Sequence, residues 1–241
     1  MDESPLFTST GIDELNIRFE HASPEELLVW AHNSFRNKVA LGTGFGSSGV
    51  VLLHILHKEK LPVKVFSLDT SLLFEETYAL WKQLENRYSL KIESVASDLT
   101  LSEQAEVYGN ALWQTDPDRC CTIRKVKPLQ HYLTDKAAWI SGIRQAQSPT
   151  RKLVRKIEWD PVNCVLKINP LADWSSEKVW ELITRENIPY NPLYDDGYSS
   201  IGCAPCTTSA CNGDNERACR WVNFNKTECG IHLPVLTGNR S

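Results

Sequence analysis

Short apolar runs recur along the first 142 residues of this chain, and each ends at a glycine or a polar residue. The runs cover 39–42, 63–68, 92–96 and 138–142, and helices are predicted between them at 50–57 and 74–88. Runs this short are typical of buried strands. Parallel strands need a crossover connection, so strands that alternate with helices form a parallel sheet covered by helices. The sequence therefore predicts an α/β fold with a mostly parallel sheet.

Further elements are predicted on both sides of this core. Ser23-Pro24-Glu25-Glu26 is a capping box with proline at the first helical position, so a helix should begin there. A hairpin is predicted over 153–168 and a helix over 175–187. A chain of 241 residues is long enough for one large core. We expect a single domain over 1–222 and a flexible C-terminal tail over 223–241.

Three predicted strands are followed by polar loops, at 43–49, 69–70 and 142–144. The carboxyl ends of parallel strands share one edge of a sheet, and ligands bind outside that edge. The first loop, Thr43-Gly44-Phe45-Gly46-Ser47-Ser48-Gly49, leads from a strand into a helix. Its glycines would let backbone N–H groups approach an anion, with a simple tight turn as the alternative. The sequence thus predicts one pocket where the three loops meet.

Two close pairs of cysteines lie about 80 residues apart in the sequence: Cys120 with Cys121, and Cys203 with Cys206. Eight cysteines are too few for a disulfide scaffold in a chain of this length. Clustered cysteines of this kind more often bind a metal. The spacing leaves zinc, an iron–sulfur cluster and four buried thiols as alternatives.

Another cysteine, Cys229, lies in a polar segment near the end of the chain, where mobility is common. A cysteine reacts as its thiolate, and nearby cations lower its pKa. Lys226 and His232 are close in sequence, and Arg217 and Arg220 are candidates for closeness in space. Cys229 is therefore predicted to be a mobile nucleophile, with an incidental exposed thiol as the alternative.

Basic residues lie beside these motifs and suit phosphate or sulfate groups, although surface charge is the simpler interpretation of any one of them. They are Arg124, Lys125, Arg144, Arg151, Arg217 and Arg220. A net charge of −4 argues against nucleic-acid binding. No apolar run approaches the roughly 18–20 residues that cross a bilayer. The first five residues are neither basic nor apolar, so we expect no secretory signal and a cytoplasmic location.

These motifs together resemble those of the assimilatory adenylyl-sulfate (APS) reductases, the iron–sulfur branch of the phosphoadenylyl-sulfate reductase family. The resemblance spans roughly 39–232. It rests on the glycine loop, Leu68-Asp69-Thr70 with 74–78, Cys120-Cys121 with 124–126, 200–207, 217–221 and Glu228-Cys229-Gly230-Ile231-His232. Two positions depart from the family pattern: Ser71 replaces a usual glycine, and Thr208 stands where arginine is common.

The resemblance implies an adenine-nucleotide alpha-hydrolase-like (PP-loop) fold whose loop lacks the aspartate of the pyrophosphatases. It implies one 4Fe–4S cluster on Cys120, Cys121, Cys203 and Cys206. It further implies thioredoxin-dependent reduction of adenylyl sulfate to sulfite and AMP, through an S-sulfo intermediate on catalytic Cys229. The implied substrate-binding residues are Thr43, Gly44, Phe45, Gly46, Ser47, Leu68, Asp69, Thr70, Lys125, Arg144, Arg151, Arg217 and Arg220.

Alternatives to this function remain open from the sequence. One is a preference for the 3′-phosphorylated substrate, and another is a zinc-containing sulfur-transfer enzyme of the pyrophosphatase type. Adenylyl sulfate and thioredoxin are the expected partners, with no nucleic acid and no membrane, and a homo-oligomer is left open.

Overall fold

A six-stranded sheet forms the centre of the computed structural model, which describes residues 8–209 and 215–232. Within these residues the strand order is β3-β2-β1-β4-β6-β5. The strands are β1 Val39–Gly42, β2 Lys64–Asp69, β3 Ile92–Ala96, β4 Ala138–Ile140, β5 Ile157–Asp160 and β6 Val165–Ile168. All neighbours pair in parallel except β5 and β6. The predicted α/β fold with a mostly parallel sheet is confirmed.

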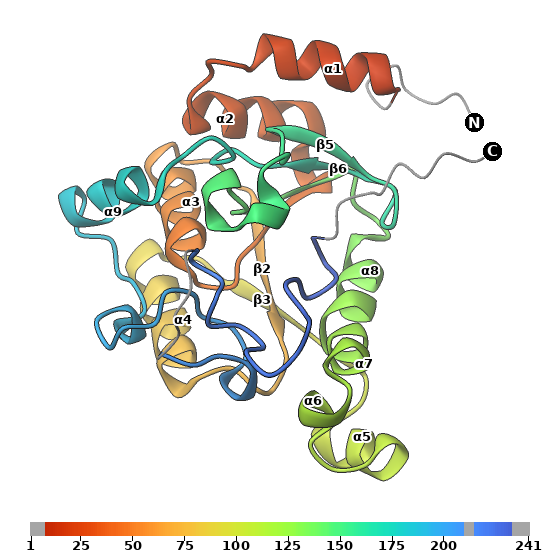
Figure 1. The fold of residues 1–241 in the computed structure, drawn as a ribbon. Helices are drawn as coiled ribbons and strands as arrows, with labels where there is room; N and C mark the ends of the chain where they lie inside the picture. The colour runs from red at the N-terminus through yellow and green to blue at the C-terminus, as the bar shows by residue number, and fades with distance from the viewer. Residues whose placement is uncertain (1–7, 210–214, 233–241) are drawn as a thin grey trace.

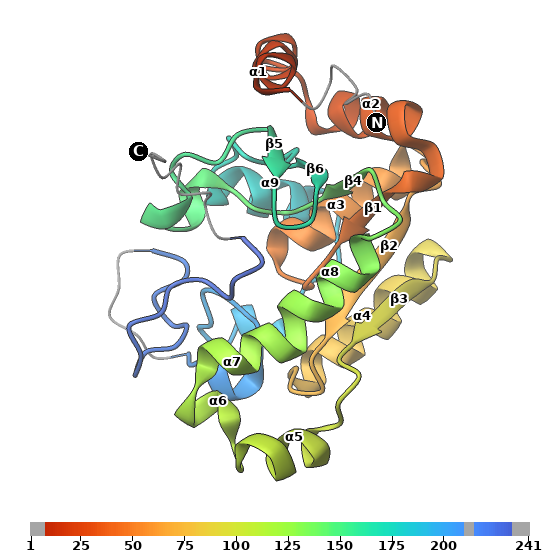
Figure 2. The same ribbon diagram turned by 90° about the vertical axis from the view of Figure 1, so that its right-hand side faces the viewer.

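Helices cover both faces of the sheet (Figures 1 and 2). The helices are α1 Ser9–Arg18, α2 Pro24–Phe35, α3 Ser47–Lys58, α4 Glu75–Tyr88, α5 Leu101–Tyr108, α6 Leu112–Thr115, α7 Pro117–Cys121, α8 Lys127–Leu133 and α9 Ser176–Arg185. Side chains alternate across a strand, so Val39 and Leu41 of β1 join the core formed with α2, α3, α4 and α9. Ala40 packs instead in the smaller core with Phe66 and α8.

Most predicted elements of the first half of the chain are present. The capping box at the start of α2 is complete, because Ser23 and Glu26 each accept a hydrogen bond from the other's backbone N–H. Helix α3 begins at Ser47, three residues earlier than predicted, so its first turn belongs to the glycine loop. The predicted hairpin forms as β5 and β6. Strand β6 also pairs in parallel with β4, which extends the main sheet.

Between β3 and β4 the chain forms helices that the sequence analysis did not predict, α5 to α8. A π-helical turn, Thr122–Val126, joins α7 to α8. The segment 215–232 has little regular structure and lies beside α7 and α8, near the carboxyl ends of the central strands (Figures 1 and 2). Within residues 8–209 and 215–232, no helix is both long and apolar enough to cross a membrane.

Candidate active site

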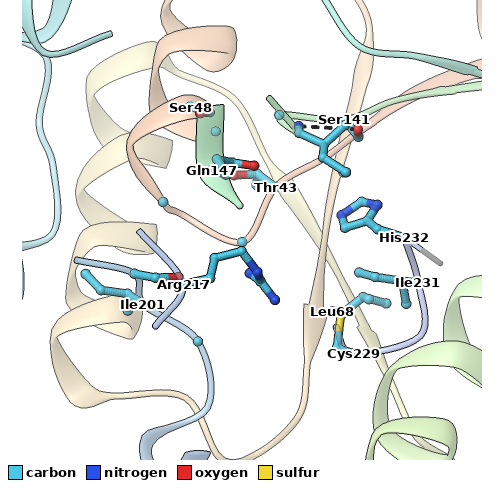
Figure 3. Close-up of a pocket in the computed structure, with 18 of the residues that line it drawn as sticks. Thr43, Ser48, Leu68, Ser141, Gln147, Ile201, Arg217, Cys229, Ile231 and His232 are labelled. Carbon is cyan, nitrogen blue, oxygen red and sulfur yellow. Dashed lines mark hydrogen bonds between the residues drawn. The ribbon is translucent and has the colours of Figure 1, made fainter. Parts of the chain in front are cut away.

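A pocket lies at the carboxyl ends of β1, β2 and β4, as the three polar loops predict. Its walls include Thr43 after β1, Leu68 in β2 and Ser141 after β4. The C-terminal segment completes it (Figure 3). Arg217 reaches in from one side, while Cys229 lies across the cavity from it.

The glycine loop packs too closely for side chains at some of its positions. A Cβ atom at Gly49 would lie 2.6 Å from the hydroxyl oxygen of Thr43. The loop's own backbone donors are partly used: the Phe45 N–H donates to that hydroxyl at 3.1 Å, and the Ser47 N–H donates to the Tyr194 hydroxyl at 3.0 Å. Phe45 itself turns away and packs on the ring of Trp81. The donors left for an anion are therefore fewer than the sequence analysis expected.

Arg144 is enclosed behind the loop instead of facing the cavity. It is 1 % exposed, and one terminal nitrogen donates to both carboxylate oxygens of Glu216 at 2.8 Å. Its Nε donates to the Ser48 hydroxyl at 2.8 Å, and its other terminal nitrogen donates to the Trp174 carbonyl at 3.2 Å. These contacts fix Glu216 and the start of α3. Arg144 thus shapes the pocket wall from behind in this structure.

A second buried arginine, Arg151, holds the C-terminal segment. Its Nε and terminal nitrogen donate to the two carboxylate oxygens of Glu228 at 2.6 and 2.7 Å. Arg217 donates to the same carboxylate at 3.1 Å. Burial raises the pKa of Glu228, but the hydrogen bond and charge of Arg151 and the charge of Arg217 outweigh burial and lower it overall. The carboxylate is therefore ionised at neutral pH.

Cys229 follows Glu228 and is 8 % exposed, so its thiol is not the surface group that its polar flanks suggest. It packs with Cys121 and Trp221. Burial alone would raise its pKa, yet Lys125 and Arg217 overcome that effect and lower it. The pocket therefore contains a thiol that is activated towards its thiolate form.

His232 ends the described C-terminal segment and closes another part of the wall. Its ring stacks on Trp139, with centroids 5.5 Å apart and planes within 3°. Burial first, and then the charges of Lys167, Arg151, Arg217 and Lys125, lower its pKa well below the usual value. The imidazole is therefore neutral at pH 7, and its buried Nδ1 has no hydrogen-bond partner among the described residues.

Two further cations lie close to the thiol. Lys125 belongs to the π-helical turn, and its pKa is raised because the thiol groups of Cys203, Cys229 and Cys121 outweigh the opposing effect of burial. Arg220 is buried, and its guanidinium lies 4.6 Å from the ring centroid of Trp221. Both residues line the pocket. Lys125 therefore lies close to Cys229 and also to members of both cysteine pairs.

The two cysteine pairs approach one another behind the pocket. Cys120 and Cys121 end α7, while the 203–206 segment is held by the Ala204 N–H, which donates to the Leu72 carbonyl at 2.7 Å. All four thiols are free, and only Cys206 is partly accessible. Burial raises the pKa of Cys120 to about 12, and its three partner cysteines contribute to that rise.

This donor set suits a soft metal centre in residue type, number and burial. Thiolates that raise one another's pKa need a cation between them. At the same time, no group of three or more His, Cys, Asp or Glu side chains that could hold a metal ion occurs in the described part of the chain. The four thiols are thus near enough to raise the pKa of Cys120 together, but no three of them are gathered as metal ligands in the described structure.

Most of the predicted substrate-binding residues line the pocket, and four do not. Those at the cavity are Thr43, Gly44, Gly46, Ser47, Leu68, Lys125, Arg151, Arg217 and Arg220, with Cys229. Phe45, Arg144, Asp69 and Thr70 lie outside it. Asp69 accepts a hydrogen bond from the Tyr78 hydroxyl at 2.7 Å, and the Thr70 hydroxyl lies 3.3 Å from the sulfur of Cys203.

Several wall residues were not predicted from the sequence: Trp139, Ser141, Gln147, Tyr194, Glu216 and Ile231. Ser141 and Gln147 flank the predicted 142–144 loop, so extending that loop by a few residues would have included them. Tyr194 and Glu216 carry no local signal, because each reaches the pocket through contacts distant in sequence.

Fold and pocket together define an α/β protein with a pocket at the carboxyl edge of a parallel sheet and a buried, activated cysteine in that pocket. Residues 38–209 match the family described as "Phosphoadenosine phosphosulfate reductase domain". The chain belongs to this family.

Individual proteins support the same assignment. Adenosine 5'-phosphosulfate reductase of Salinibacter ruber is 44% identical over 233 residues, which are 96% of this chain and 92% of that protein. The crystal structure of phosphoadenylyl-sulfate (PAPS) reductase from Candida auris, a phosphate complex, has a TM-score of 0.74 and 32% identity. The match covers 83% of this chain and 98% of the Candida auris chain.

Some less similar proteins share only the fold with this chain. FMN adenylyltransferase of Candida glabrata is 20% identical, with a TM-score of 0.55, and the match covers 82% of this chain and 65% of that one. The fold is therefore of the adenine-nucleotide alpha-hydrolase-like (PP-loop) type, as predicted.

Proposed function

We propose that this protein reduces adenylyl sulfate to sulfite and AMP, with thioredoxin as the source of electrons, in assimilatory sulfate reduction and cysteine biosynthesis. The observation that carries the proposal is the position of Cys229. Its thiol is buried in the pocket at the edge of the sheet, and Lys125 and Arg217 lower its pKa there. The name of the Salinibacter ruber relative supports the choice of substrate.

The proposed reaction consists of two substitutions at sulfur. In the first, the Cys229 thiolate attacks the sulfur of adenylyl sulfate. The bond between the two sulfurs forms as the sulfur–oxygen bond to the phosphate breaks, and AMP leaves with that electron pair. In the second, a thioredoxin thiolate attacks Cys229 Sγ, and sulfite leaves with the electrons of the sulfur–sulfur bond. The second thioredoxin thiol then displaces Cys229, so one dithiol is oxidised for each sulfite formed.

The first substitution brings an anionic thiolate to an anionic sulfate, so its main requirement is electrostatic. Lys125, Arg217 and Arg220 line the pocket and supply the positive charge in our proposal. Arg144 has the charge of Glu216 beside it at 2.8 Å, so its role is to hold the wall in place. AMP is a stable leaving group, and the reaction therefore needs little help from a general acid.

The glycine loop and the carboxyl ends of β1 and β2 are available to bind the adenosine part of adenylyl sulfate. Gly44, Gly46 and the first turn of α3 line the cavity, so their backbone N–H groups and the positive end of the helix dipole are available to an anion. These are the donors that we assign to the nucleotide phosphate.

For the cofactor we propose one 4Fe–4S cluster on Cys120, Cys121, Cys203 and Cys206. Their burial, free thiols and mutual proximity support this assignment. When bound, such a cluster would tie the two segments together and add its field to the pocket beside Lys125. The thiols supply all the electrons of the proposed reaction.

A second candidate substrate is 3′-phosphoadenylyl sulfate, because the family description and the Candida auris relative both name that compound. Parallel sulfite-release rates on the two substrates separate the candidates. We also propose a cytoplasmic location, since a pool of reduced thioredoxin requires a reducing compartment.

Replacement of the nucleophile tests the proposal. Cys229→Ser should bind AMP with unchanged affinity and release no sulfite, because a serine hydroxyl remains protonated near pH 7. Wild-type protein given adenylyl sulfate without thioredoxin should gain one sulfo group by intact mass, and peptide mapping should find it on Cys229. Cys164→Ser is the matched control, because Cys164 is exposed and does not line the pocket. Normal turnover by Cys229→Ser, or a sulfo group on another cysteine, would refute the assignment.

A further inference from the structure

Glu228, the residue before Cys229, is a carboxylate that the C-terminal segment inserts deep into the protein. It is 6 % exposed, and so is Arg151. Arg151 binds both of its oxygens, at 2.6 and 2.7 Å, and Arg217 adds a contact at 3.1 Å. The Thr150 hydroxyl donates to it at 3.3 Å. Four hydrogen bonds from three residues therefore converge on one carboxylate.

Such a pair is stable only while both partners are in place. A buried carboxylate without partners is strongly unfavourable, and so is an arginine left buried without its counter-ion. Bidentate pairing also demands a defined geometry, unlike a diffuse attraction between surface charges. The Glu228 carboxylate therefore has one well-defined seat, which we call the arginine fork, made of Arg151 and Arg217.

The fork determines where the thiol lies, because Cys229 is the next residue. Consecutive Cα atoms are about 3.8 Å apart, so a fixed Glu228 leaves Cys229 little freedom. The other charged residue nearby, Lys226, pairs with Asp118, but that carboxylate is largely exposed and such pairs contribute little. The ion pair between Glu228 and the arginine fork, in contrast, is buried.

Cys229 is 8 % exposed in this arrangement, so a second protein could not reach its sulfur. An external thiol must nevertheless attack that sulfur in the second substitution. Residues 226–232 therefore have to move between the two steps, and the Glu228 carboxylate must leave the arginine fork when they do.

We propose that Glu228 is a positioning residue: its carboxylate, seated in the arginine fork, places the Cys229 thiol in the pocket for sulfur transfer and releases the segment for the reductant. The inference rests on the proposed function for the order of steps. The seat itself rests on the contacts of Glu228 alone.

Glu228→Gln tests the seat, because glutamine keeps the shape and removes the charge. Amide hydrogen exchange over 226–232, measured by mass spectrometry on cofactor-loaded protein without substrate, reports whether the segment is docked. We expect exchange about tenfold faster or more, as for loss of a hydrogen bond between charged groups. Glu106→Gln, on an exposed face of α5, is the matched control and should exchange as the wild type does.

Single-turnover sulfur transfer at saturating adenylyl sulfate tests positioning. Glu228→Gln should lower this rate by about the same factor, because fewer molecules hold the thiol in place. Sulfite release by thioredoxin from protein already carrying the sulfo group should not slow. A general structural defect would slow both steps. Slower sulfur transfer with unchanged sulfite release would instead show that the variant affects only the docking of the segment.

Glu228→Asp keeps the charge on a shorter side chain and should lie between the wild type and Glu228→Gln in both measurements. Unchanged exchange in Glu228→Gln, unchanged sulfur transfer, or an aspartate variant worse than the glutamine variant would each overturn the proposal. A wild type that forms no sulfo group would instead refute the proposed function, and the exchange measurement would still decide whether Glu228 holds the segment.

Discussion

Gly202 leaves room for the guanidinium of Arg220, and an alanine there should displace it. A Cβ atom at Gly202 would lie 2.2 Å from a terminal nitrogen of Arg220 and 2.4 Å from its Cζ. Carbon contacts are normally about 3.5–4.0 Å, so the guanidinium would have to retreat by roughly 1.5 Å. Gly202 does not have a positive φ, so the backbone itself accepts alanine.

The displacement should damage catalysis more than folding. The group that moves is the end of a flexible side chain, and its lost contacts are the Trp221 ring at 4.6 Å and a long hydrogen bond to the Cys206 carbonyl. These contribute about 1 kcal/mol or less to the free energy of unfolding. A misplaced charge-assisted contact with the substrate sulfate costs about 1.5–3 kcal/mol. We therefore expect kcat/KM to fall roughly 10- to 150-fold with a small change in Tm.

The assay is thioredoxin-coupled sulfite release by Gly202→Ala, by Arg220→Ala and by the double variant. Effects that act through one group are not additive. The double variant should therefore be no worse than Arg220→Ala. Gly202 also precedes Cys203, so the absorbance spectrum and iron content of each variant should be compared with the wild type. A Gly202→Ala enzyme within about twofold of wild type, or losses that multiply in the double variant, would refute the reasoning.

The other predictions concern the glycine loop, the thiol and the cofactor. Gly46→Val should weaken AMP binding measured by calorimetry, because even a Cβ atom would lie 3.4 Å from the Tyr194 hydroxyl and the added methyl groups reach further; unchanged affinity in a folded variant would show that the loop is only a turn. Lys125→Met should raise the pKa of Cys229, since Lys125 is the foremost cation that lowers it, so the rise of sulfo-group formation with pH should move to higher pH; an unmoved profile would contradict this. Cys203→Ser should lose iron and acid-labile sulfide in chemical analysis, whereas a fully active wild type with zinc and no sulfide would exclude the cluster.

The strands were predictable because each is specified locally. The run Ile92–Ala96 was predicted with the bounds that the structure gives it, and β1 likewise. The missed helix α5 did carry a local signal, since Thr100 and Glu103 form a complete capping box. The π-helical turn had no such signal, and it packs against β2, which is distant in the sequence.

Residue type alone singled out the paired cysteines and Cys229, whose roles as cluster ligands and nucleophile stay predictions. The surroundings of the basic residues were not predictable, because the carboxylates that pair with them lie far away in the sequence. Arg144 was expected at the substrate, but it meets Glu216, 72 residues away, and Arg151 meets Glu228, 77 residues away. Only the tertiary fold decides whether a cation faces a ligand or a carboxylate of the same chain. The polar flanks of Cys229 suggested exposure for the same reason, since the partners that bury Glu228 are remote.

His232 and Ile231 form part of the pocket wall, although they belong to the segment that carries the nucleophile. A nucleotide that touches both this segment and the sheet edge must bind more tightly when the segment is docked, and by linkage it favours docking by the same factor. AMP remaining after sulfur transfer would therefore hold the thiol inward, and its departure would free it. AMP would then have to leave before thioredoxin could attack Cys229, because the sheet edge and the C-terminal segment both form the wall that binds AMP. AMP and thioredoxin would compete with each other although they never touch.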